Sequence, residues 1–387
     1  MSPPVPRINT FINVTGKPKV DKISKFFILG EFLIGVNRLH IIGIRKFCFL
    51  FMTLCICVSI STSLIFKYAF TENDRFTHQY FMLEIFRFLM CSTLALIFQG
   101  KLINFYNELS KFDEDIGFEA NKTENRKNIQ NYSLMLVAIV LSITLYLFSD
   151  LGFLIDLLLF LPGKLQQCFE LHYYGHLLIL IIPRIKLLTN YISFSYPNKK
   201  NNELEEIGNF AKKYHIFNRQ IRNFSKIEMK RLINLYNRII IAFDFLYEST
   251  KWQILIFMTT IFTLSLDFSF KIAIRVINNN CSISMYLIAA SFFLIEILPF
   301  LTPCIYAGQV CSQVRVLKDV ISSKLYENIL DKSNRSSARS LLSLIETRDL
   351  SFSLFHMFEI DIALPFKFMG LLITYLIILL QFDKILN

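Results

Sequence analysis

The sequence predicts an all-α membrane protein with seven transmembrane helices, and two observations lead to this fold class. Of its 387 residues, 53% are apolar and 18% are charged, whereas a soluble domain has about 45–50% apolar and about 25% charged residues. Two stretches, Phe47–Phe66 and Asn128–Ser149, contain no charged residue. A helix needs about 20 apolar residues to cross a hydrocarbon core about 30 Å thick. These features exclude an ordinary soluble enzyme, a disordered chain and a secreted disulfide scaffold.

Seven apolar segments follow one another along the chain, and we expect each to be a membrane span. They lie near residues 45–67, 80–99, 131–149, 168–190, 252–271, 284–307 and 366–383. The fourth span is the least regular, because Pro183 interrupts it and the apolar stretch Leu151–Leu161 comes just before it. We expect that stretch to be either a re-entrant piece or part of the third span.

The basic residues are distributed unevenly between the two sides of the predicted bundle. With the N-terminus inside, the segments on the inner side contain 33 Lys and Arg residues and those on the outer side contain 6. Cytoplasmic segments retain such residues, so we expect a cytoplasmic N-terminus and an extracellular C-terminus. The net charge of +11 is assigned to the cytoplasmic face and not to nucleic-acid binding, because no aromatic recognition motif accompanies it. A G-protein-coupled receptor would have the opposite orientation.

The long inner segments contain amphipathic helices. From Ile207 to Phe224 the apolar residues are spaced by three and four, as in a coiled-coil seam. Two further apolar series lead into the fifth span and extend the sixth: Leu232, Leu235, Tyr236 and Ile239, and Val310, Val314, Leu317, Ile321 and Leu325. The polar run Asp331–Ser337 is predicted to break the second of these helices, before a short helix at Ala338–Glu346. These apolar faces either pack within one subunit or join several subunits.

The last apolar span carries a motif close to the C-terminus. Thr374 and Tyr375 are followed by five apolar residues and then by Gln381 and Phe382. This pattern and its position resemble the signature that closes insect gustatory receptors. Upstream, the segment Phe358–Asp361 is similar to the Phe-x-apolar-Asp element before the last helix of that family, although Met357 stands where the family usually has Gly.

The resemblance implies a tetrameric ligand-gated cation channel that a small chemical tastant opens. It implies a pore lined by the last helix of each subunit, an outward-facing ligand pocket in a six-span bundle, and a cytoplasmic anchor. The implied division of the chain is a cytoplasmic segment at 1–44, the bundle at 45–307 with a cytoplasmic helical extension at about 191–251, the anchor at 308–365, and the pore helix with a short extracellular tail at 366–387. The implied partners are the tastant, membrane lipid and, in a homo- or hetero-tetramer, other gustatory receptor subunits. The implied location is the plasma membrane of sensory neurons, in the dendrites, cell body and axon.

The residues of the last helix suit a water-filled path. Thr374, Ile378 and Gln381 are spaced so that they share one helix face. A Gln that faced lipid would leave its amide without partners, so it should face a pore or, alternatively, a neighbouring helix within the bundle. The candidate pore and gate residues are Thr374, Tyr375, Ile378, Gln381, Phe382 and Asp383. The resemblance supports a gating role for Phe382 and Gln381, whereas the role of Asp383 in attracting cations follows from its charge and position.

Other polar residues in the spans are candidate ligand contacts. Glu84 and Arg87 are three residues apart and either form an ion pair on one helix face or contact a ligand. The remaining candidates are expected near the outer ends of the spans: Tyr80, Tyr146, Asp150, His172, Tyr173, His176, Asp267 and Tyr286. The tyrosines alternatively belong to the interfacial aromatic belt. Asn280 is the one sequon on the predicted outside, and Cys168 and Cys281 could form a disulfide there.

The sequence gives no indication of catalysis. It contains no nucleophile elbow, no zinc-protease motif, no phosphate-binding loop and no dinucleotide fingerprint. The cysteines show no metal-ligand spacing, so we expect neither a metal nor a cofactor. Three other functions remain open: an insect odorant receptor of the same superfamily, a transporter, which should show internal repeats, and a G-protein-coupled receptor.

Overall fold

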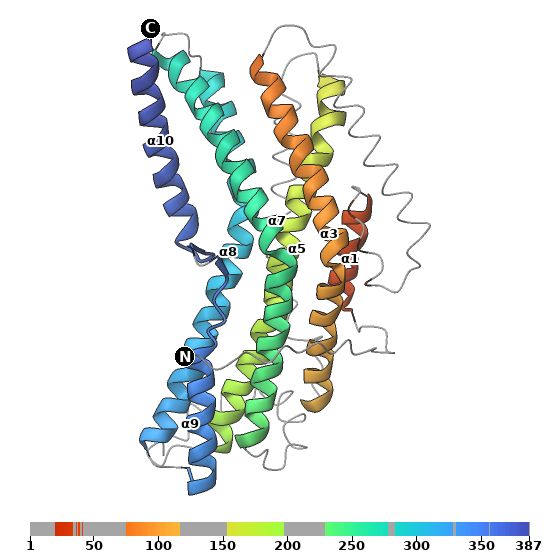
Figure 1. The fold of residues 1–387 in the computed structure, drawn as a ribbon, viewed down its shortest axis with the longest axis vertical. Coiled ribbons are helices and arrows are strands. Elements are labelled where there is room, and N and C mark those ends of the chain that lie inside the picture. Colours follow the sequence, from red (N-terminus) through yellow and green to blue (C-terminus); the bar gives the residue numbers. More distant parts are fainter. Residues whose placement is uncertain are drawn as a thin grey trace, which may run out of the picture.

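The protein is a long helical bundle (Figure 1). The computed structural model describes residues 20–33, 36, 38, 41, 75–116, 153–196, 229–277, 283–327, 330–355 and 357–386. Four long helices run side by side along the main axis: α3 (Arg75–Ile116), α5 (Phe153–Ser195), α7 (Met229–Ile277) and α8 (Ile283–Tyr326). The shorter elements are α1 (Lys22–Leu33), α9 (Lys332–Thr347), β1 (Ser353–Leu354), β2 (Phe358–Glu359) and α10 (Leu364–Leu386).

Five of the predicted spans lie within these helices. The second, fourth, fifth, sixth and seventh predicted spans fall in α3, α5, α7, α8 and α10, and the spans at 45–67 and 131–149 lie outside the described residues. In the described part of the chain, four helices are long and apolar enough to cross a membrane, namely α3, α5, α7 and α10. The predicted helical fold is therefore confirmed in part: the described part of the chain is mostly helical, and its long helices follow the predicted order.

The fourth span differs from its prediction. The apolar residues from Phe153 onward belong to α5, which continues without a break to Ser195, so the re-entrant and third-span interpretations were both wrong. Pro183 lies inside this helix. Helices can keep an internal proline where neighbouring groups satisfy the freed backbone atoms. Surrounding protein covers α5 on most sides, because 83% of an 18-residue apolar stretch of this helix is buried.

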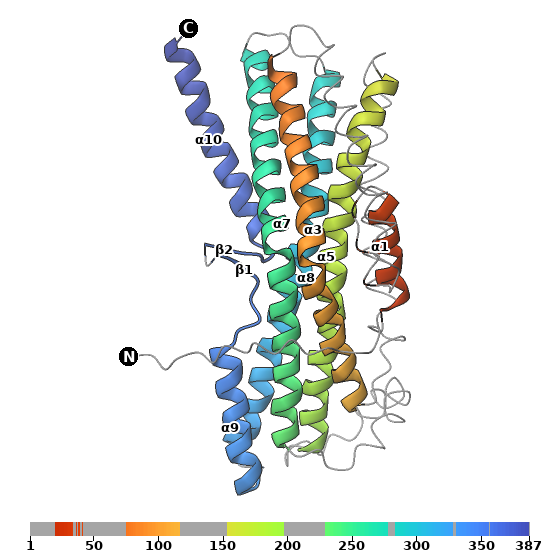
Figure 2. The same cartoon turned by 45° about the vertical axis from the view of Figure 1, so that its right-hand side comes forward.

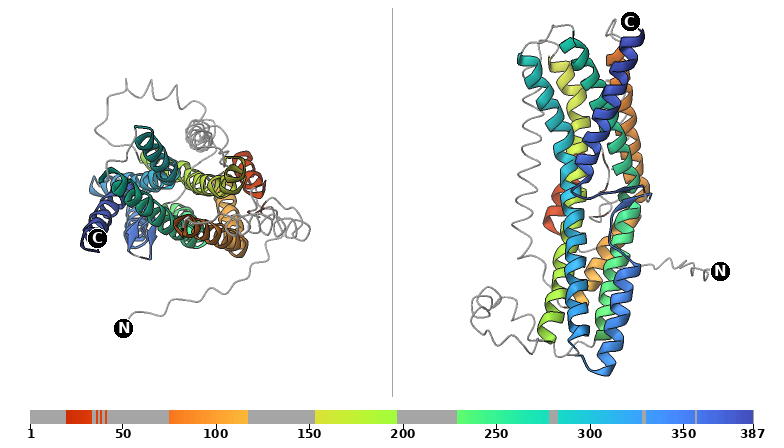
Figure 3. Two further views of the ribbon diagram at one scale, coloured as in Figure 1. Left: turned by 90° about the horizontal axis from the view of Figure 1, so that it is seen from above. Right: turned by 90° about the vertical axis from the view of Figure 1, so that its left-hand side faces the viewer.

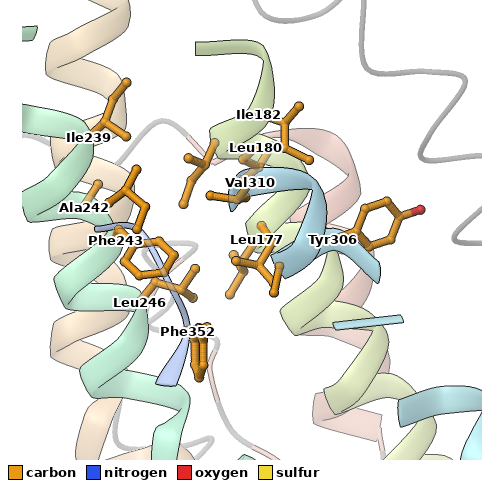
Figure 4. Packing of buried hydrophobic residues seen from close by; sticks show 14 of the residues in the cluster. Leu177, Leu180, Ile182, Ile239, Ala242, Phe243, Leu246, Tyr306, Val310 and Phe352 are labelled. Atoms are coloured by element: carbon orange, nitrogen blue, oxygen red, sulfur yellow. The ribbon is translucent and has the colours of Figure 1, made fainter. Parts of the chain in front are cut away.

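The buried core joins the long helices in their middle and lower parts. In Figure 4, Leu177 and Leu180 of α5 face Phe243 and Leu246 of α7, and Val310 of α8 lies beside them. All five of these side chains are buried. Full burial of one such side chain contributes about 1.5–3 kcal/mol, so this contact region is a main source of stability.

The two apolar series predicted next to the fifth and sixth spans lie in α7 and α8. Leu232, Leu235, Tyr236 and Ile239 are buried within the single chain, as are Val310, Val314, Leu317 and Ile321, while Leu325 is half-buried. Both α7 and α8 pack against α9, whose Leu341 and Ile345 are buried. These faces therefore pack within one subunit. The predicted seam from Ile207 to Phe224 lies outside the described residues.

The boundary between α8 and α9 was predicted in part. The helix α8 ends at Tyr326, but α9 begins at Lys332, so the polar run Asp331–Ser337 starts the second helix and does not separate the two. The cause is an N-cap: the carboxylate of Asp331 accepts a hydrogen bond from the backbone N–H of Asn334 at 3.3 Å. An Asp at this position satisfies a backbone donor that the first helical turn leaves open.

A small antiparallel hairpin connects α9 to α10. Ser353 pairs with Glu359, and Leu354 pairs with Phe358. At the turn, Phe355 has a φ of 51°, a conformation in which few residues other than glycine occur. Its ring lies 4.6 Å from the ring of Trp252 on α7, measured between centroids. This contact holds the hairpin against the bundle at the point where α10 begins.

The helix α10 lies at the edge of the bundle. It contacts α7 and α8, and Figure 2 shows that it leans away from them towards the C-terminus. Seen from above, α10 and α1 lie on opposite sides of the bundle (Figure 3). Only 22% of an 18-residue apolar stretch of α10 is buried within the chain. Most of the α10 surface is thus free for contact with lipid or other chains.

Candidate functional site

One face of α10 packs on the bundle. Leu364, Phe368 and Leu372 are buried. The Phe368 ring meets Phe262 of α7 edge to face at 5.4 Å and lies 6.4 Å from Phe300 of α8. These aromatic contacts fix the rotation of α10 about its own axis.

The bundle leaves most of the predicted pore residues uncovered. Thr374, Ile378, Gln381 and Phe382 are exposed in the single chain. The Thr374 hydroxyl donates to the backbone carbonyl of Gly370 at 2.9 Å, which keeps this hydroxyl satisfied in a helix. A side chain built at Gly370 would meet no atom within 4 Å, so this face is open over several turns.

Tyr375 and Asp383 differ from the other predicted pore residues. Tyr375 is 46% exposed, but its ring meets Phe262 of α7 edge to face at 5.8 Å, so it points back towards the bundle and not along the open face. The side chain of Asp383 lies outside the described residues.

Glu84 and Arg87 are part of a buried cluster of four charges, which we call the four-charge cluster: Glu84 and Arg87 of α3, Lys164 of α5 and Glu296 of α8. Arg87 pairs with Glu84, and Lys164 pairs with Glu296 and, at 3.0 Å, with Glu84. At most 5% of any of these residues is exposed. The ion-pair interpretation of Glu84 and Arg87 is therefore the one that the geometry supports.

Neutral groups complete the four-charge cluster. Arg87 donates to the side-chain oxygen of Gln167 at 2.7 Å and to the backbone carbonyl of Gly163 at 3.0 Å. The amide of Gln167 donates to Glu296 at 3.3 Å. Two cations face two carboxylates, so the charges balance, and hydrogen bonds offset part of the desolvation cost of burying them.

A second buried group surrounds Arg38, and we call it the Arg38 cluster: Glu31 of α1, Arg38, Glu170 and Tyr174 of α5, and Gln253 of α7. Arg38 donates to Glu31 at 2.6 Å and to Glu170 at 2.8 Å. Tyr174 lies within hydrogen-bond distance of Glu170 and of the Gln253 oxygen. The Gln253 amide donates to the backbone carbonyl of Cys91 on α3 at 3.0 Å. This cluster joins α1, α3, α5 and α7 at one point.

The sequence did not predict the Arg38 cluster. Neither Arg38 nor Glu31 was singled out in the sequence, and Glu170 lies 132 positions beyond Arg38 in the chain. One signal was available: Glu170 is a carboxylate inside a predicted span, and such a residue needs a partner.

The prediction that His176 lies near the outer end of a span was wrong. It is buried in the middle of α5 against α1, where its ring stacks on Phe27 at 5.7 Å. Its Nε2 atom lies 3.1 Å from the Ser24 hydroxyl and 3.3 Å from the Asp21 carboxylate. His172 and Tyr173 also point inward from the same helix, His172 onto the backbone oxygen of Cys168 at 2.8 Å and Tyr173 onto Tyr106 at 3.2 Å. Tyr173 and His176 thus join α5 to α3 and α1, His172 bonds within α5, and none of the three lies at the outer end of the helix.

The other ligand candidates are placed only in part. Tyr80 near the start of α3, Asp267 near the end of α7 and Tyr286 near the start of α8 lie towards the bundle end at which α10 finishes (Figure 1). Asp267 pairs with Lys271 at 2.6 Å. Tyr146, Asp150, Asn280 and Cys281, and the side chains of Tyr80 and Tyr286, lie outside the described residues. Cys168 is a buried free thiol, so the structure does not support the disulfide with Cys281 that the sequence left open.

Tyr174 lines each of two small cavities among the described residues. One is bounded by Leu246, Pro303 and Phe352, and the other by Arg38, Gln99 and Ser249. Each has room for about one water molecule, far less than an organic ligand needs. In the part of the chain that the structure describes, no group of three or more His, Cys, Asp and Glu side chains could hold a metal ion.

Comparison with known proteins agrees with this architecture. Residues 33–386 match the sequence profile of the 7tm Chemosensory receptor family. Among curated proteins, none matches the chain in sequence. Of the solved structures, the insect olfactory receptor OR5 from Machilis hrabei, determined in complex with eugenol, is similar with a TM-score of 0.63 over 92% of this chain and 97% of that chain, at 13% sequence identity. That likeness shows a shared fold, and the profile match covers nearly the whole length. The chain belongs to the 7tm chemosensory receptor family.

Proposed function

We propose that this protein is a gustatory receptor: a ligand-gated, non-selective cation channel that assembles as a tetramer and opens when a small tastant binds. The observation that carries the proposal is the division of α10 into two faces. Leu364, Phe368 and Leu372 pack on the bundle, whereas Thr374 and Gln381 lie on the open side.

The open face of α10 is best satisfied around a shared axis. An amide in lipid without a hydrogen-bond partner costs about 2–7 kcal/mol, which disfavours Gln381 facing hydrocarbon. Four copies of α10 would place four Gln381 and four Phe382 side chains around one path. Apolar rings close a narrow pore by excluding water, and polar side chains hydrate it when it widens. Phe382 then forms the closed constriction, and Gln381 lines the open path.

The remaining pore candidates take different parts. Thr374 and Ile378 lie on the open face together with Gln381, so they line the path below the constriction. Tyr375 contacts Phe262, and we assign it the role of holding the rotation of α10. Asp383 follows directly after the constriction and would raise the cation concentration at the outer mouth.

The tastant site is proposed for the bundle end at which α10 finishes. Tyr80, Asp267 and Tyr286 lie towards this end, and together with Tyr146 and Asp150 they would supply the aromatic walls and few polar groups of a small-molecule site. Glu84 and Arg87 are bonded to other protein groups, so we place them beneath the site as structural support. His176 belongs to the contact with α1 and is not proposed as a ligand contact.

Orientation and location follow from the charge distribution and the family. We propose a cytoplasmic N-terminus, an extracellular C-terminus, and an anchor built from α9 and the ends of α7 and α8 that pack on it within one subunit. Other surfaces of this anchor would contact the neighbouring subunits. The protein would act in the plasma membrane of sensory neurons, as a homo-tetramer or with other gustatory receptor subunits.

An odorant receptor is the second candidate function, because the similar solved structure is an olfactory receptor bound to eugenol. The terminal motif of Thr374, Tyr375, Gln381 and Phe382 favours the gustatory function. Whole-cell recordings during application of sugars, bitter compounds and volatile odorants separate the two. A cation current with the first or second class supports the proposal, and a current with odorants alone supports the alternative. Ligand-driven substrate uptake without current would indicate a transporter and would overturn both.

A further inference from the structure

The Arg38 cluster contains more carboxylates than cations. Glu31 and Glu170 are both fully buried, and Arg38, at 2% exposure, is the one cation that pairs with either of them among the described residues. If both carboxylates were ionised, the cluster would hold one uncompensated negative charge. Burying an uncompensated charge costs several kcal/mol, and such groups take up a proton instead.

Two buried oxygen atoms of the cluster lack hydrogen-bond donors. Oε1 of Glu31 and Oε1 of Glu170 are enclosed and have no partner in the described part of the protein. An ionised carboxylate buried in this way leaves half of its charge unsolvated. A proton on one of the two oxygens removes that charge, and the neutral acid can still accept the hydrogen bond from Arg38 through its other oxygen.

The two carboxylates are not equivalent. Oε2 of Glu170 lies within hydrogen-bond distance of both Arg38 and the Tyr174 hydroxyl, whereas Glu31 accepts only from Arg38. Donors stabilise the ionised form of a carboxyl group, so Glu31, which has fewer donors, is the better proton acceptor. We propose that Glu31 is a proton-binding site: at neutral pH it carries a proton on Oε1, and loss of that proton loosens α1 from α5.

The surroundings of Glu31 support this assignment. The charged or titratable groups that face the cluster are Arg38 itself, Glu170, Tyr173 and Tyr174 from α5, and Cys91 from α3, while Gln253 from α7 is neutral. Glu31 lies in α1, outside the candidate spans. Burial raises the pKa of its carboxyl above the ordinary value; Arg38 opposes this shift, and Glu170 adds to it.

The proposal makes stability depend on pH with a defined sign. A carboxyl with a higher pKa in the folded protein than in the unfolded chain binds its proton more tightly when folded. The stabilisation from that proton is complete below the unfolded pKa and is lost as the pH rises towards the folded pKa. The unfolding temperature of the purified protein in detergent should therefore fall between about pH 5 and about pH 8, by about 2 °C per pH unit from this group.

Glu31→Gln tests the proposal, because Gln has the shape of a protonated Glu. We expect this variant to lose that part of the pH dependence and to unfold at a higher temperature than the wild type at about pH 8. Glu170→Gln should do the same, because it leaves Arg38 with one carboxylate. The double variant leaves Arg38 buried without a carboxylate and should unfold at a lower temperature than either single variant. As a control, Glu346→Gln removes a half-exposed partner of Lys318 and should keep the wild-type pH dependence.

Infrared spectra give an independent readout. The wild type at neutral pH should show the carbonyl stretch of a buried carboxylic acid, and this band should be missing in Glu31→Gln. If Glu31→Gln lowers the unfolding temperature equally at every pH, Glu31 is an ordinary ionised partner of Arg38, and the proposal is overturned. Failure of both single variants to fold at about pH 8 overturns it as well, because each is expected to be at least as stable as the wild type there.

Discussion

The Tyr375 ring of α10 meets the Phe262 ring of α7 edge to face, with 5.8 Å between their centroids. Because Tyr375 lies seven residues after Phe368, which contacts the same Phe262, two turns of α10 are held on one side chain. Phe262 therefore helps to fix the rotation of α10, together with the contact between Phe368 and Phe300 of α8. Thr374 and Gln381 face away from the bundle as a consequence.

The first prediction concerns the outer end of α10. Phe382→Ala removes the ring proposed to close the pore, so it should increase the basal current in cells that express the receptor. Phe366→Ala is the matched control, because Phe366 is also an exposed phenylalanine of α10 but lies at the opposite end of the helix. Equal basal currents in the two variants and the wild type would remove Phe382 from the gate.

The second prediction concerns ion conduction. Gln381→Ala should alter conductance or gating, because it removes an amide that would hydrate the open path. Asp383→Asn should lower cation conductance mainly at low ionic strength, where surface charges are least screened. Single-channel recordings at two salt concentrations measure both effects. A conductance that is independent of residue 383 at low salt would contradict the proposed role of Asp383.

The third prediction tests the orientation of the chain. An antibody added to intact cells should reach an epitope tag placed after Asn387 but not a tag placed before Met1. This expectation follows from the excess of Lys and Arg on the predicted inner side. The reverse labelling pattern would overturn both the topology and the proposed channel.

The fourth prediction concerns the four-charge cluster. Lys164→Gln removes the cation that pairs with Glu296, and Glu296→Gln leaves Lys164 with Glu84 as its remaining carboxylate. Each variant should therefore lower the unfolding temperature, and the double variant should regain part of the loss. We expect a coupling energy of about 1–3 kcal/mol. The matched control is Lys271→Gln with Asp267→Asn, a half-exposed pair for which about 0.2–1 kcal/mol is expected. Additive effects at residues 164 and 296 would show that the two side chains do not stabilise each other.

The fifth prediction concerns a two-point ion pair between α5 and α3. Arg184 donates from Nε to one oxygen of Asp113 at 2.9 Å and from Nη2 to the other at 2.6 Å. Lys keeps the charge but cannot form this fork, so Arg184→Lys should lower the free energy of unfolding by about 1–3 kcal/mol. Arg348→Lys, at an exposed pair with Asp244, should change it little. Equal effects of the two substitutions would contradict a structural role for the fork.

The sequence predicted features that depend on local spacing. The pair of Glu84 and Arg87 follows from residues three apart on a helix, and the burial of Leu232 and Val314 follows from apolar periodicity. The spacing of Thr374, Ile378 and Gln381 likewise places them on one helix face, and all three are exposed in the single chain; their role in a pore stays a prediction. In each case the helical period alone determines which residues lie together.

Features that depend on tertiary contacts were missed. Nothing in the local sequence brings Glu296 to Lys164, which lies 132 residues earlier, or Arg38 to Glu170. The inward position of His176 was missed for a related reason. The fourth span was taken to have its outer end near His176, because Leu151–Leu161 was assigned to a different element. Once α5 is seen to begin at Phe153, His176 falls in the middle of the helix.

The burial of α5 has a consequence for how the protein enters the membrane. This helix is surrounded by protein and carries Glu170, His172 and His176 where a lone span would face lipid. A charged side chain at the centre of a span costs about 2.5–3.5 kcal/mol during insertion. As an isolated segment, α5 should therefore insert poorly. Its stable insertion during synthesis depends on α3, made before it, and on α7 and α8, made after it, which supply the partners of its polar groups.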